Sequence, residues 1–499
     1  MLMDTPSAPV AVQPADEGPV RIWRVGTLTY TTTGLVVLFV WLLWGDFSLA
    51  MRDRAVGPVL GLLFNRYHAS DLVTGLFFAS LPAGIGLILC PIISFRSDRH
   101  RGRWGRRIPF LLIPTPFVLL GMVGLAFSPV IGARVHAMLG PGAPSLDTVV
   151  ILSFGVFWVL FEIASIVAGT VYGALINDVV PQQVMGRFYG MFRALGLLAG
   201  IIFNYSIFGQ ADTAYVWIFL GMGTLFGVGF TLMCLKVKEG EYPPVLLMDK
   251  GRDIRGFIHA TKTYFQECFS VSYYRWLFAY SAVAAQLTAP IAPFILYFSK
   301  SPGINLTTDS FGKYQALTYV ISLCLAYPLG AIADRFHPIR ATMGALILYA
   351  MGTLWGALYA RDQATFTIAF VLNGVLAGVY FTVSASMGQR LLPRAEFAQF
   401  SSAGGIIVGI GGMVFTPLVG LCLDLVHHNY RYTFLISTVL SVVALIGLMI
   451  VHWEFMKLGG PGNYKAPEPS GKRSPLPAPI PMVQTVALRE AATKNVRMR

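Results

Sequence analysis

Residues 94–110 read SFRSDRHRGRWGRRIPF, and they join two apolar runs, at residues 71–95 and 109–129. Six arginines lie between Arg96 and Arg107. So dense a cationic stretch between two long apolar runs is typical of a short loop on the cytoplasmic side of a membrane, where Lys and Arg accumulate. The loop thus indicates that the two apolar runs are membrane helices, and the number of similar runs along the chain predicts the fold.

The composition excludes an ordinary soluble protein. Of the 499 residues 55% are hydrophobic and only 12% are charged, whereas soluble domains carry about 25% charged residues. Apolar runs of about 20 residues are long enough to cross a bilayer as helices. The predicted spans are residues 29–63, 71–95, 109–129, 148–178, 188–209, 214–236, 276–299, 311–333, 340–360, 365–390, 398–422 and 432–454. We therefore expect an all-α polytopic membrane protein with twelve transmembrane helices.

The distribution of Lys and Arg predicts the orientation. The connection after the sixth span is rich in both, the third connection has only Arg134, and the fifth has neither. This alternation places both termini and the central linker in the cytoplasm of an integral plasma-membrane or inner-membrane protein. The net charge of +13 is thereby explained without a nucleic-acid partner.

The two halves of the chain repeat each other. Asp98 follows the second span and Asp334 the eighth, while Pro181 and Pro393 each stand seven residues before a Phe. Two six-helix halves that rock about a central site are typical of transporters. We expect a disordered N-terminus (1–26), a first bundle (27–238), a central linker (239–275), a second bundle (276–455) and a disordered, basic, Pro-rich tail (456–499).

The loop at residues 94–110 contains more than orientation requires. A purely orienting loop explains the arginines but not Asp98 or its counterpart Asp334. Asp98 can accept hydrogen bonds at the N-terminus of a neighbouring helix, where free N–H groups favour an anion. The arginines can then pair with a carboxylate such as Asp178. We expect a cytoplasmic latch between the halves, formed by Asp98, Arg99, Arg106, Arg107, Asp178, Asp334 and Arg335.

These motifs resemble the major facilitator superfamily, whose signature in this loop is a small residue, then Asp-Arg, then Gly-Arg-Arg. The ending RWGRRIPF and the segment ALINDVVPQQVMGRFYGMFRALG are similar to the sucrose and glycoside–pentoside–hexuronide:cation symporter branches. Ser94 departs from the usual Gly, and the second copy at residues 333–335 lacks Gly-Arg-Arg. The motif FRSDRHR also resembles a branch linked to pigment delivery and light-harvesting assembly. The resemblance implies two pseudo-symmetric six-helix bundles.

The first span contains charges that lipid does not tolerate. Residues 41–64 read WLLWGDFSLAMRDRAVGPVLGLLF. If the span ends at Met51, Arg52–Arg54 lie in an outer loop and AVGPVLGLLF has no role. If the helix continues, Asp46 and Asp53 lie within about 20° of each other on one face, together with Gly57. We favour the long helix, with that face turned to a water-filled cavity.

Polar residues of other spans are candidates for the same cavity. Glu162 and Arg193 need a partner or a function, because an unpaired charge in a membrane is costly. Gln286, Asn373 and Tyr380 suit hydrogen bonding either to a solute or between helices. The predicted coupling and substrate site is therefore Asp46, Asp53, Glu162, Arg193, Gln286, Asn373 and Tyr380.

The functional hypothesis is a monomeric secondary transporter that moves a small solute with a co-transported proton by alternating access. The preferred proton carriers are, in order, Asp46, Glu162 and Asp53. The resemblance implies a sugar or glycoside as the solute. The alternative is a membrane assembly or pigment-delivery factor on the same scaffold. We expect no enzyme activity, cofactor or metal, because HExxH, Ser/His/Asp and phosphate-loop motifs are missing from the sequence.

Overall fold

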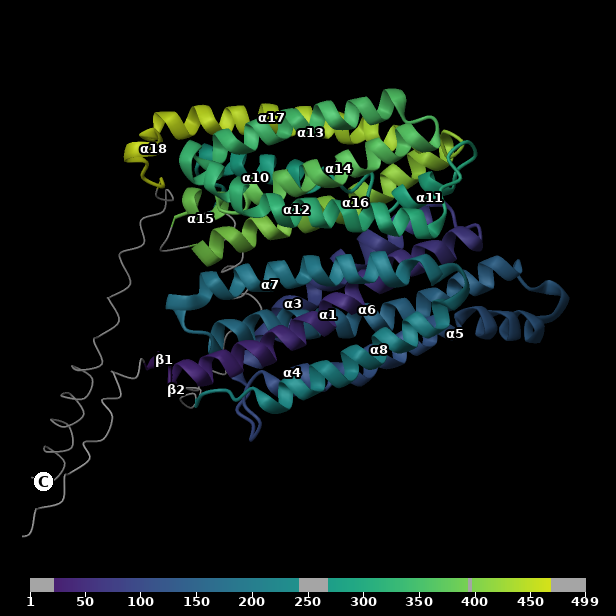
Figure 1. Cartoon of the computed structure of the whole chain (residues 1–499), viewed down its shortest axis with the longest axis horizontal. Helices are drawn as coiled ribbons and strands as arrows, with labels where there is room; N and C mark the ends of the chain where they lie inside the picture. Colours follow the sequence, from purple (N-terminus) through teal and green to yellow (C-terminus); the bar gives the residue numbers. More distant parts are fainter. Residues whose placement is uncertain (1–21, 242–267, 394–396, 468–499) are drawn as a thin grey trace, which may run out of the picture.

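The computed structural model describes residues 22–241, 268–393 and 397–467. Two helical bundles lie side by side, one built from each half of the chain (Figure 1). The first contains β1 (Trp23–Val25), β2 (Leu28–Tyr30), α1 (Thr32–Arg66), α2 (Asp71–Gly75), η1 (Leu76–Ser80), α3 (Leu81–Arg99), α4 (Ile108–Leu112), α5 (Pro114–Leu139), η2 (Gly140–Gly142), α6 (Leu146–Val179), α7 (Gln182–Ile202), η3 (Phe203–Ile207), η4 (Phe208–Gln210) and α8 (Ala211–Lys236). The second contains α10 (Ser272–Ala285), α11 (Ile295–Lys300), α12 (Thr308–Phe336), α13 (Pro338–Tyr359), α14 (Gln363–Ser384), α15 (Met387–Leu391), α16 (Phe397–Leu425), α17 (Arg431–Lys457) and α18 (Gly460–Asn463).

The expected membrane spans are confirmed as helices. In the described part of the chain, ten segments are long and apolar enough to cross a membrane. One of them, Gln182–Lys236, is 55 residues long and holds both α7 and α8. The seventh predicted span is α10 and α11 together, interrupted between Gln286 and Phe294 by turns, where Pro290 and Pro293 supply no N–H groups. With these two adjustments the described helices match the twelve predicted spans.

The first span is one long helix, which agrees with the preferred of the two alternatives and not with a span that ends at Met51. Helix α1 has 35 residues, or about 52 Å at 1.5 Å per residue. It begins at the N-cap Thr31, whose side chain accepts the Gly34 N–H, and it continues through Arg52, Asp53 and Arg54. These three charges therefore lie in a helix inside the first bundle and not in an outer loop.

The bundles have two distinguishable ends. Strands β1 and β2 and the short helix α18 lie at the left of Figure 1, and α11 lies at the right. We call these the hairpin end and the far end. Because α1 starts directly after β2, the connection that follows it, at residues 67–70, belongs to the far end. The connection that follows α16, at residues 426–430, belongs to the same end, because Asp424 of α16 is hydrogen-bonded to residues 71 and 72.

The apolar core joins the two bundles at one end. One buried cluster extends from the first bundle to far-end residues of the second, including Phe298, Phe366 and Phe434. A separate cluster fills the rest of the second bundle, around Tyr274, Tyr349 and Phe400. Apolar packing therefore connects the halves at the far end.

Three expected boundaries need correction. Trp23–Val25, expected to be disordered, pair with Leu28–Tyr30 as an antiparallel hairpin. The second bundle begins at Ser272 and not at residue 276. Part of the expected tail is ordered, because α17 reaches Lys457 and the Tyr464 hydroxyl donates to the Leu391 carbonyl at 2.6 Å. Residues 1–21, 242–267 and 468–499, on which the other expectations of disorder and of a linker fall, lie outside the described residues.

Candidate functional site

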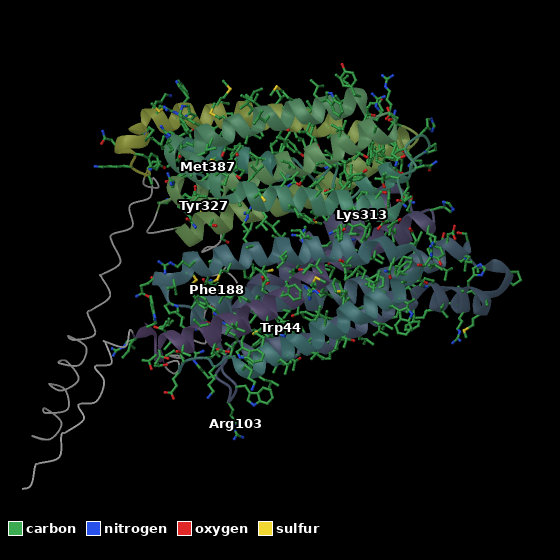
Figure 2. All side chains as sticks on the ribbon, in the orientation of Figure 1. Trp44, Arg103, Phe188, Lys313, Tyr327 and Met387 are labelled. Carbon is green, nitrogen blue, oxygen red and sulfur yellow. The ribbon has the colours of Figure 1, made fainter. Side chains whose placement is uncertain are left out.

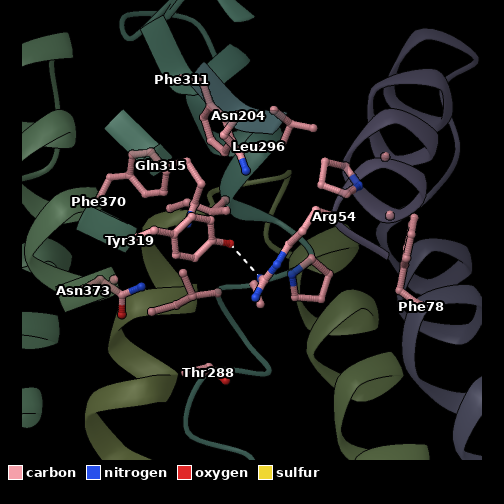
Figure 3. Close-up of a pocket in the computed structure, with 18 of the residues that line it drawn as sticks. Arg54, Phe78, Asn204, Thr288, Leu296, Phe311, Gln315, Tyr319, Phe370 and Asn373 are labelled. Atoms are coloured by element: carbon pink, nitrogen blue, oxygen red, sulfur yellow. Dashed lines mark hydrogen bonds between the residues drawn. The ribbon is translucent and has the colours of Figure 1, made fainter. Parts of the chain in front are cut away.

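A cavity of about 460 Å³ lies between the two bundles. Helix α1 supplies Asp53, Arg54, Gly57, Pro58 and Gly61 to its wall. The other lining residues come mainly from the second half (Figure 3) and include Thr288, Leu296, Phe311, Gln315, Tyr319, Phe370 and Asn373, with Phe78 and Asn204 from the first half. The wall is therefore part aromatic and part polar and is built by both repeats, which is the usual make-up of a small-molecule site.

Arg54 reaches across the cavity to the other half. Its Nη1 donates to the Tyr319 hydroxyl at 2.9 Å, and its guanidinium carbon lies 4.8 Å from the centre of the Tyr319 ring (Figure 3). Gly200 of α7 makes room for this contact, since an added Cβ would come within 2.8 Å of the Tyr319 ring and 3.4 Å of Arg54 Nε. The contact combines a hydrogen bond with a cation–π interaction.

Arg52 and Asp53 form an ion pair beside the cavity. Arg52 donates from Nε and Nη2 to Asp53 Oδ1, at 3.0 and 2.6 Å. Arg52 is 2% exposed, with its guanidinium 4.5 Å from the centre of the Phe226 ring, whereas the Asp53 side chain is 51% exposed. Glu162 is half-buried and close enough to interact electrostatically with both residues. The ion pair thus joins the cavity wall to the interior of the first bundle.

The prediction that Asp46 faces the central passage is wrong for this conformation. Asp46 is 3% exposed and does not line the cavity. Its neighbour Gly45 packs against Met233 of α8, and Tyr172 of α6 donates to the Leu42 carbonyl one turn away, at 2.6 Å. Asp46 and Asp53 do share a helix face, but α6 and α8 cover that face at the level of Asp46 and leave it open at Asp53.

The other four predicted site residues lie in four different environments. Asn373 lines the cavity and accepts from the Tyr349 hydroxyl at 3.0 Å. Gln286 joins helices instead, donating to the Val408 carbonyl at 3.2 Å. Tyr380 lies elsewhere in the second bundle, in a separate apolar cavity of about 330 Å³. Arg193 links the halves outside the central cavity, through a hydrogen bond to Thr382 Oγ1 at 2.9 Å.

The predicted latch residues form a network at the hairpin end, but within one half. Arg106 pairs with Asp178 through Nη2 at 2.6 Å and Nε at 3.1 Å, and Arg107 pairs with the same carboxylate at 2.9 Å. Asp98 pairs with Arg107. Glu239, which the sequence analysis did not single out, accepts the backbone N–H groups of residues 106–108 at 2.8–2.9 Å. The expectation that this network holds the halves together is therefore wrong for this conformation.

The remaining latch predictions are not met by the described contacts. The Arg99 guanidinium lies over the Phe95 ring, at 3.6 Å, and not against Asp178. Arg335 lies over Phe336, at 5.7 Å. The side chain of Asp334 is outside what the structure describes.

A second polar cluster, at the far end, does join the halves. The Asp424 carboxylate of α16 accepts the backbone N–H groups of Asp71 and Leu72 at 2.9 and 3.0 Å. Asp71 in turn contacts His428 Nδ1 at 2.7 Å and accepts from the Tyr430 hydroxyl at 3.2 Å. Sequence reasoning missed this cluster. One signal was available: an Asp in the last turn of an apolar helix faces the negative end of the helix dipole and so calls for a partner.

Comparisons with known proteins agree with the fold. A family profile described as Major Facilitator Superfamily matches residues 276–495. A mouse protein named membrane-associated transporter protein is 28% identical over 210 residues, which is 40% of this chain and 36% of that protein. The Bacillus subtilis putative metabolite transport protein YwtG is 23% identical over 180 residues, 35% of this chain and 38% of that protein. The matches therefore span only about a third of the length of these curated relatives.

Solved structures show the same architecture over most of the chain. A D-xylose–proton symporter superposes with a TM-score of 0.61 at 14% identity, covering 87% of this chain and 98% of that one. A bacterial homologue of the human lysosomal transporter Spinster, in an inward-facing conformation, gives a TM-score of 0.60 at 14% identity, covering 85% and 98%. The chain is thus an integral membrane protein with the major facilitator fold. The profile match and these structures support its placement in the major facilitator superfamily and support a transporter.

Proposed function

We propose that the protein is a secondary transporter whose solute binds in the cavity between the bundles and is released by alternating access. The observation that carries this proposal is that both halves line one cavity, which holds an Asp and an Arg at membrane depth. Ionisable groups in membrane spans usually mark a substrate or ion pathway. Movement of one half against the other would take this cavity apart and reassemble it.

The conformation supports an assignment of the two sides. Among described residues, the hydrogen bonds between the halves lie at the far end or near the middle, as between Asp424 and Asp71 or Arg54 and Tyr319. We place the hairpin end, with its arginine-rich loop, in the cytoplasm. The conformation is then closed toward the outside, and the solute leaves toward the cytoplasm.

We assign the proposed proton carrier to Asp53. Of the three carboxylates expected to carry a proton, Asp53 is the one that lines the cavity. Its exposed side chain can exchange a proton with water there, and Arg52 links it electrostatically to Glu162. Because Asp46 is buried in this conformation, we rank it last of the three proposed proton carriers instead of first. A sugar or glycoside as solute rests on the resemblance of the sequence motifs alone.

The test is uptake of a panel of radiolabelled sugars and small organic acids into proteoliposomes, with and without an imposed pH gradient. Asp53→Asn is expected to abolish gradient-driven accumulation, with Asp309→Asn as the matched control because Asp309 pairs with Lys313 on the surface. Unchanged accumulation by Asp53→Asn would remove Asp53 from the coupling. No uptake of any solute, with the protein correctly folded, would remove the transport function.

A further inference from the structure

The charge of the central cavity indicates what kind of solute it binds. Among the described residues that line it, Asp53 and Arg54 are the two charged ones, and Asp53 is already paired with Arg52. Among the described residues no carboxylate oxygen lies within 4 Å of Arg54, the distance that defines the ion pairs found elsewhere in the structure. Arg54 is thus a cation at the seam of the two halves without a protein counter-ion in that part of the chain.

The hydrogen-bonding capacity of Arg54 is largely unused. A guanidinium has five N–H groups in a planar fork, and Arg54 uses one of them for a hydrogen bond to a described residue, the Tyr319 hydroxyl. The Tyr319 ring lies against the guanidinium, and Gly200 leaves the space that this arrangement needs. Arg54 is therefore held in place while most of its donors stay available. This is the geometry in which arginine binds a carboxylate through two parallel hydrogen bonds.

The neighbouring side chains suit a small polar solute more than a lipid. Gln315 and Asn373 contribute amide groups to the same wall, on the same side of the cavity as Phe370 (Figure 3). A volume of about 460 Å³ is that of a site for a molecule of modest size. A solute with one anionic end and a polar body would place its charge on Arg54 and its body toward the amides of the second half.

We propose that the solute carries a carboxylate, which binds the guanidinium of Arg54 as a bidentate ion pair. This inference rests on the proposed transport function, because it assigns a substrate class to the same cavity. This proposal explains why a membrane span contains a guanidinium without a counter-ion from the described protein. The solute supplies the counter-ion and offsets the cost of desolvating the cation.

The experiment compares binding of matched acidic and neutral probes to the purified full-length protein. The probe pairs are glucuronate with glucuronamide and glycerate with glycerol, and binding is measured by calorimetry and by the shift of the melting temperature. The wild-type protein is expected to bind at least one acid about 10- to 100-fold more tightly than its neutral partner, as a charge-assisted bidentate contact provides. Arg54→Gln removes that preference, and Arg54→Lys restores it in part, because a lysine supplies the charge without the fork.

Two variants control for indirect effects. Arg193→Gln removes another arginine that joins the halves, outside the cavity, and is expected to keep the acid preference. Tyr319→Phe removes the hydrogen bond to Arg54 but leaves the guanidinium, and is also expected to keep it. Melting in the absence of probe shows that each variant is folded.

The possible outcomes separate this proposal from the transport function. Equal binding of acids and neutral partners, failure of every acid to bind, or an acid preference that survives Arg54→Gln each overturns the carboxylate site. Uptake of a neutral solute together with any of these results leaves the transport function intact. Binding of an acid that depends on Arg54 but is never followed by uptake supports the site and overturns transport.

Discussion

At both ends of the molecule a carboxylate accepts backbone N–H groups at the start of a helix. At one end this contact stays within the first half, and at the other it crosses the seam, the boundary between the two halves. At the hairpin end, Glu239 accepts the N–H groups that begin α4, and Arg106 and Arg107 share Asp178. All of these residues belong to the first half. At the far end, Asp424 of the second half accepts the N–H groups that begin α2 in the first half. A carboxylate on a helix N-terminus stabilises one bundle in the first case and joins two bundles in the second.

Two side chains labelled in Figure 2 mark the two ends of the molecule, one in each bundle. Arg103 projects from the loop at the hairpin end, whereas Lys313 lies toward the far end, where the halves meet (Figure 2). The apolar cores follow the same division, since one cluster crosses the seam at the far end and another stays within the second bundle. In the proposed transport cycle, the contacts that must change are those that cross the boundary between the two halves. The far-end cluster should therefore control the conformational equilibrium, and the hairpin-end network should control the stability of the first bundle.

The largest effect is expected from bulk at the far-end seam. A Cβ on Gly420 would lie 2.2 Å from the Asp71 carbonyl oxygen, a backbone atom that cannot move aside. Gly420→Val should therefore keep the far end from closing and reduce uptake to background. Spin-label distances across that end should lengthen. Gly409→Val, in the same helix but with open space around it, is the control, and equal loss of uptake in both variants would contradict the assignment.

Removal of the Asp424 charge should shift the equilibrium without blocking closure. Hydrogen bonds to charged groups contribute about 1.5–3 kcal/mol, so Asp424→Asn should favour the conformation open at the far end by roughly 10- to 100-fold. Asp362→Asn provides the comparison, because Asp362 caps α14 within its own half. The same spin-label distances measure both variants. A shift of equal size in Asp362→Asn would show that the equilibrium does not depend on the contact between the two halves.

A change in the hairpin-end network should affect the stability of the first bundle and not the conformational equilibrium. Glu239→Gln weakens a cap inside the first bundle, for which a loss of about 1 kcal/mol in the free energy of unfolding is typical. The melting temperature should fall while the far-end distances stay unchanged. A change in those distances with no loss of stability would mean that this network acts across the seam after all.

The smallest effect is a pH dependence of stability at His337, which starts α13 at the hairpin end. Its Nδ1 accepts the Ile339 N–H at 3.4 Å. Burial, and then the charges of Arg390 and Arg340, lower the pKa of His337 below its ordinary value of 6.5. Below pH 6.5 the unfolded chain takes up a proton that the folded protein resists, so stability that is complete above this pH is lost as the pH falls.

His337→Asn should reduce this loss, because Asn has no charge to gain and tolerates the positive φ of 69° at this position. Melting temperatures one pH unit above and below 6.5 give the measurement. His427→Asn, at an exposed position with a φ of 55°, is the control. An unchanged pH dependence in His337→Asn would assign it to other groups.

The candidate site was predicted only in part, for reasons that particular residues illustrate. Helical periodicity placed Asp46 and Asp53 on one face, and this is correct as geometry. Periodicity describes direction around a helix and not what covers it at each level, so the cover that α6 and α8 give Asp46 could not be deduced. Arg54 was recognised only as a charge inside an apolar run, although it lies three residues before Gly57 on the stripe that lines the cavity.

The sequence by itself determined the helical spans, the two repeats and the long first helix, because hydrophobic length and the cost of buried charge act locally along the chain. Only the tertiary structure decided which charges share the cavity, which carboxylate caps a helix of the other half, and which end is closed. Those features depend on pairs such as Asp71 with Asp424, 353 residues apart, and such pairs are brought together by the packing of the two bundles.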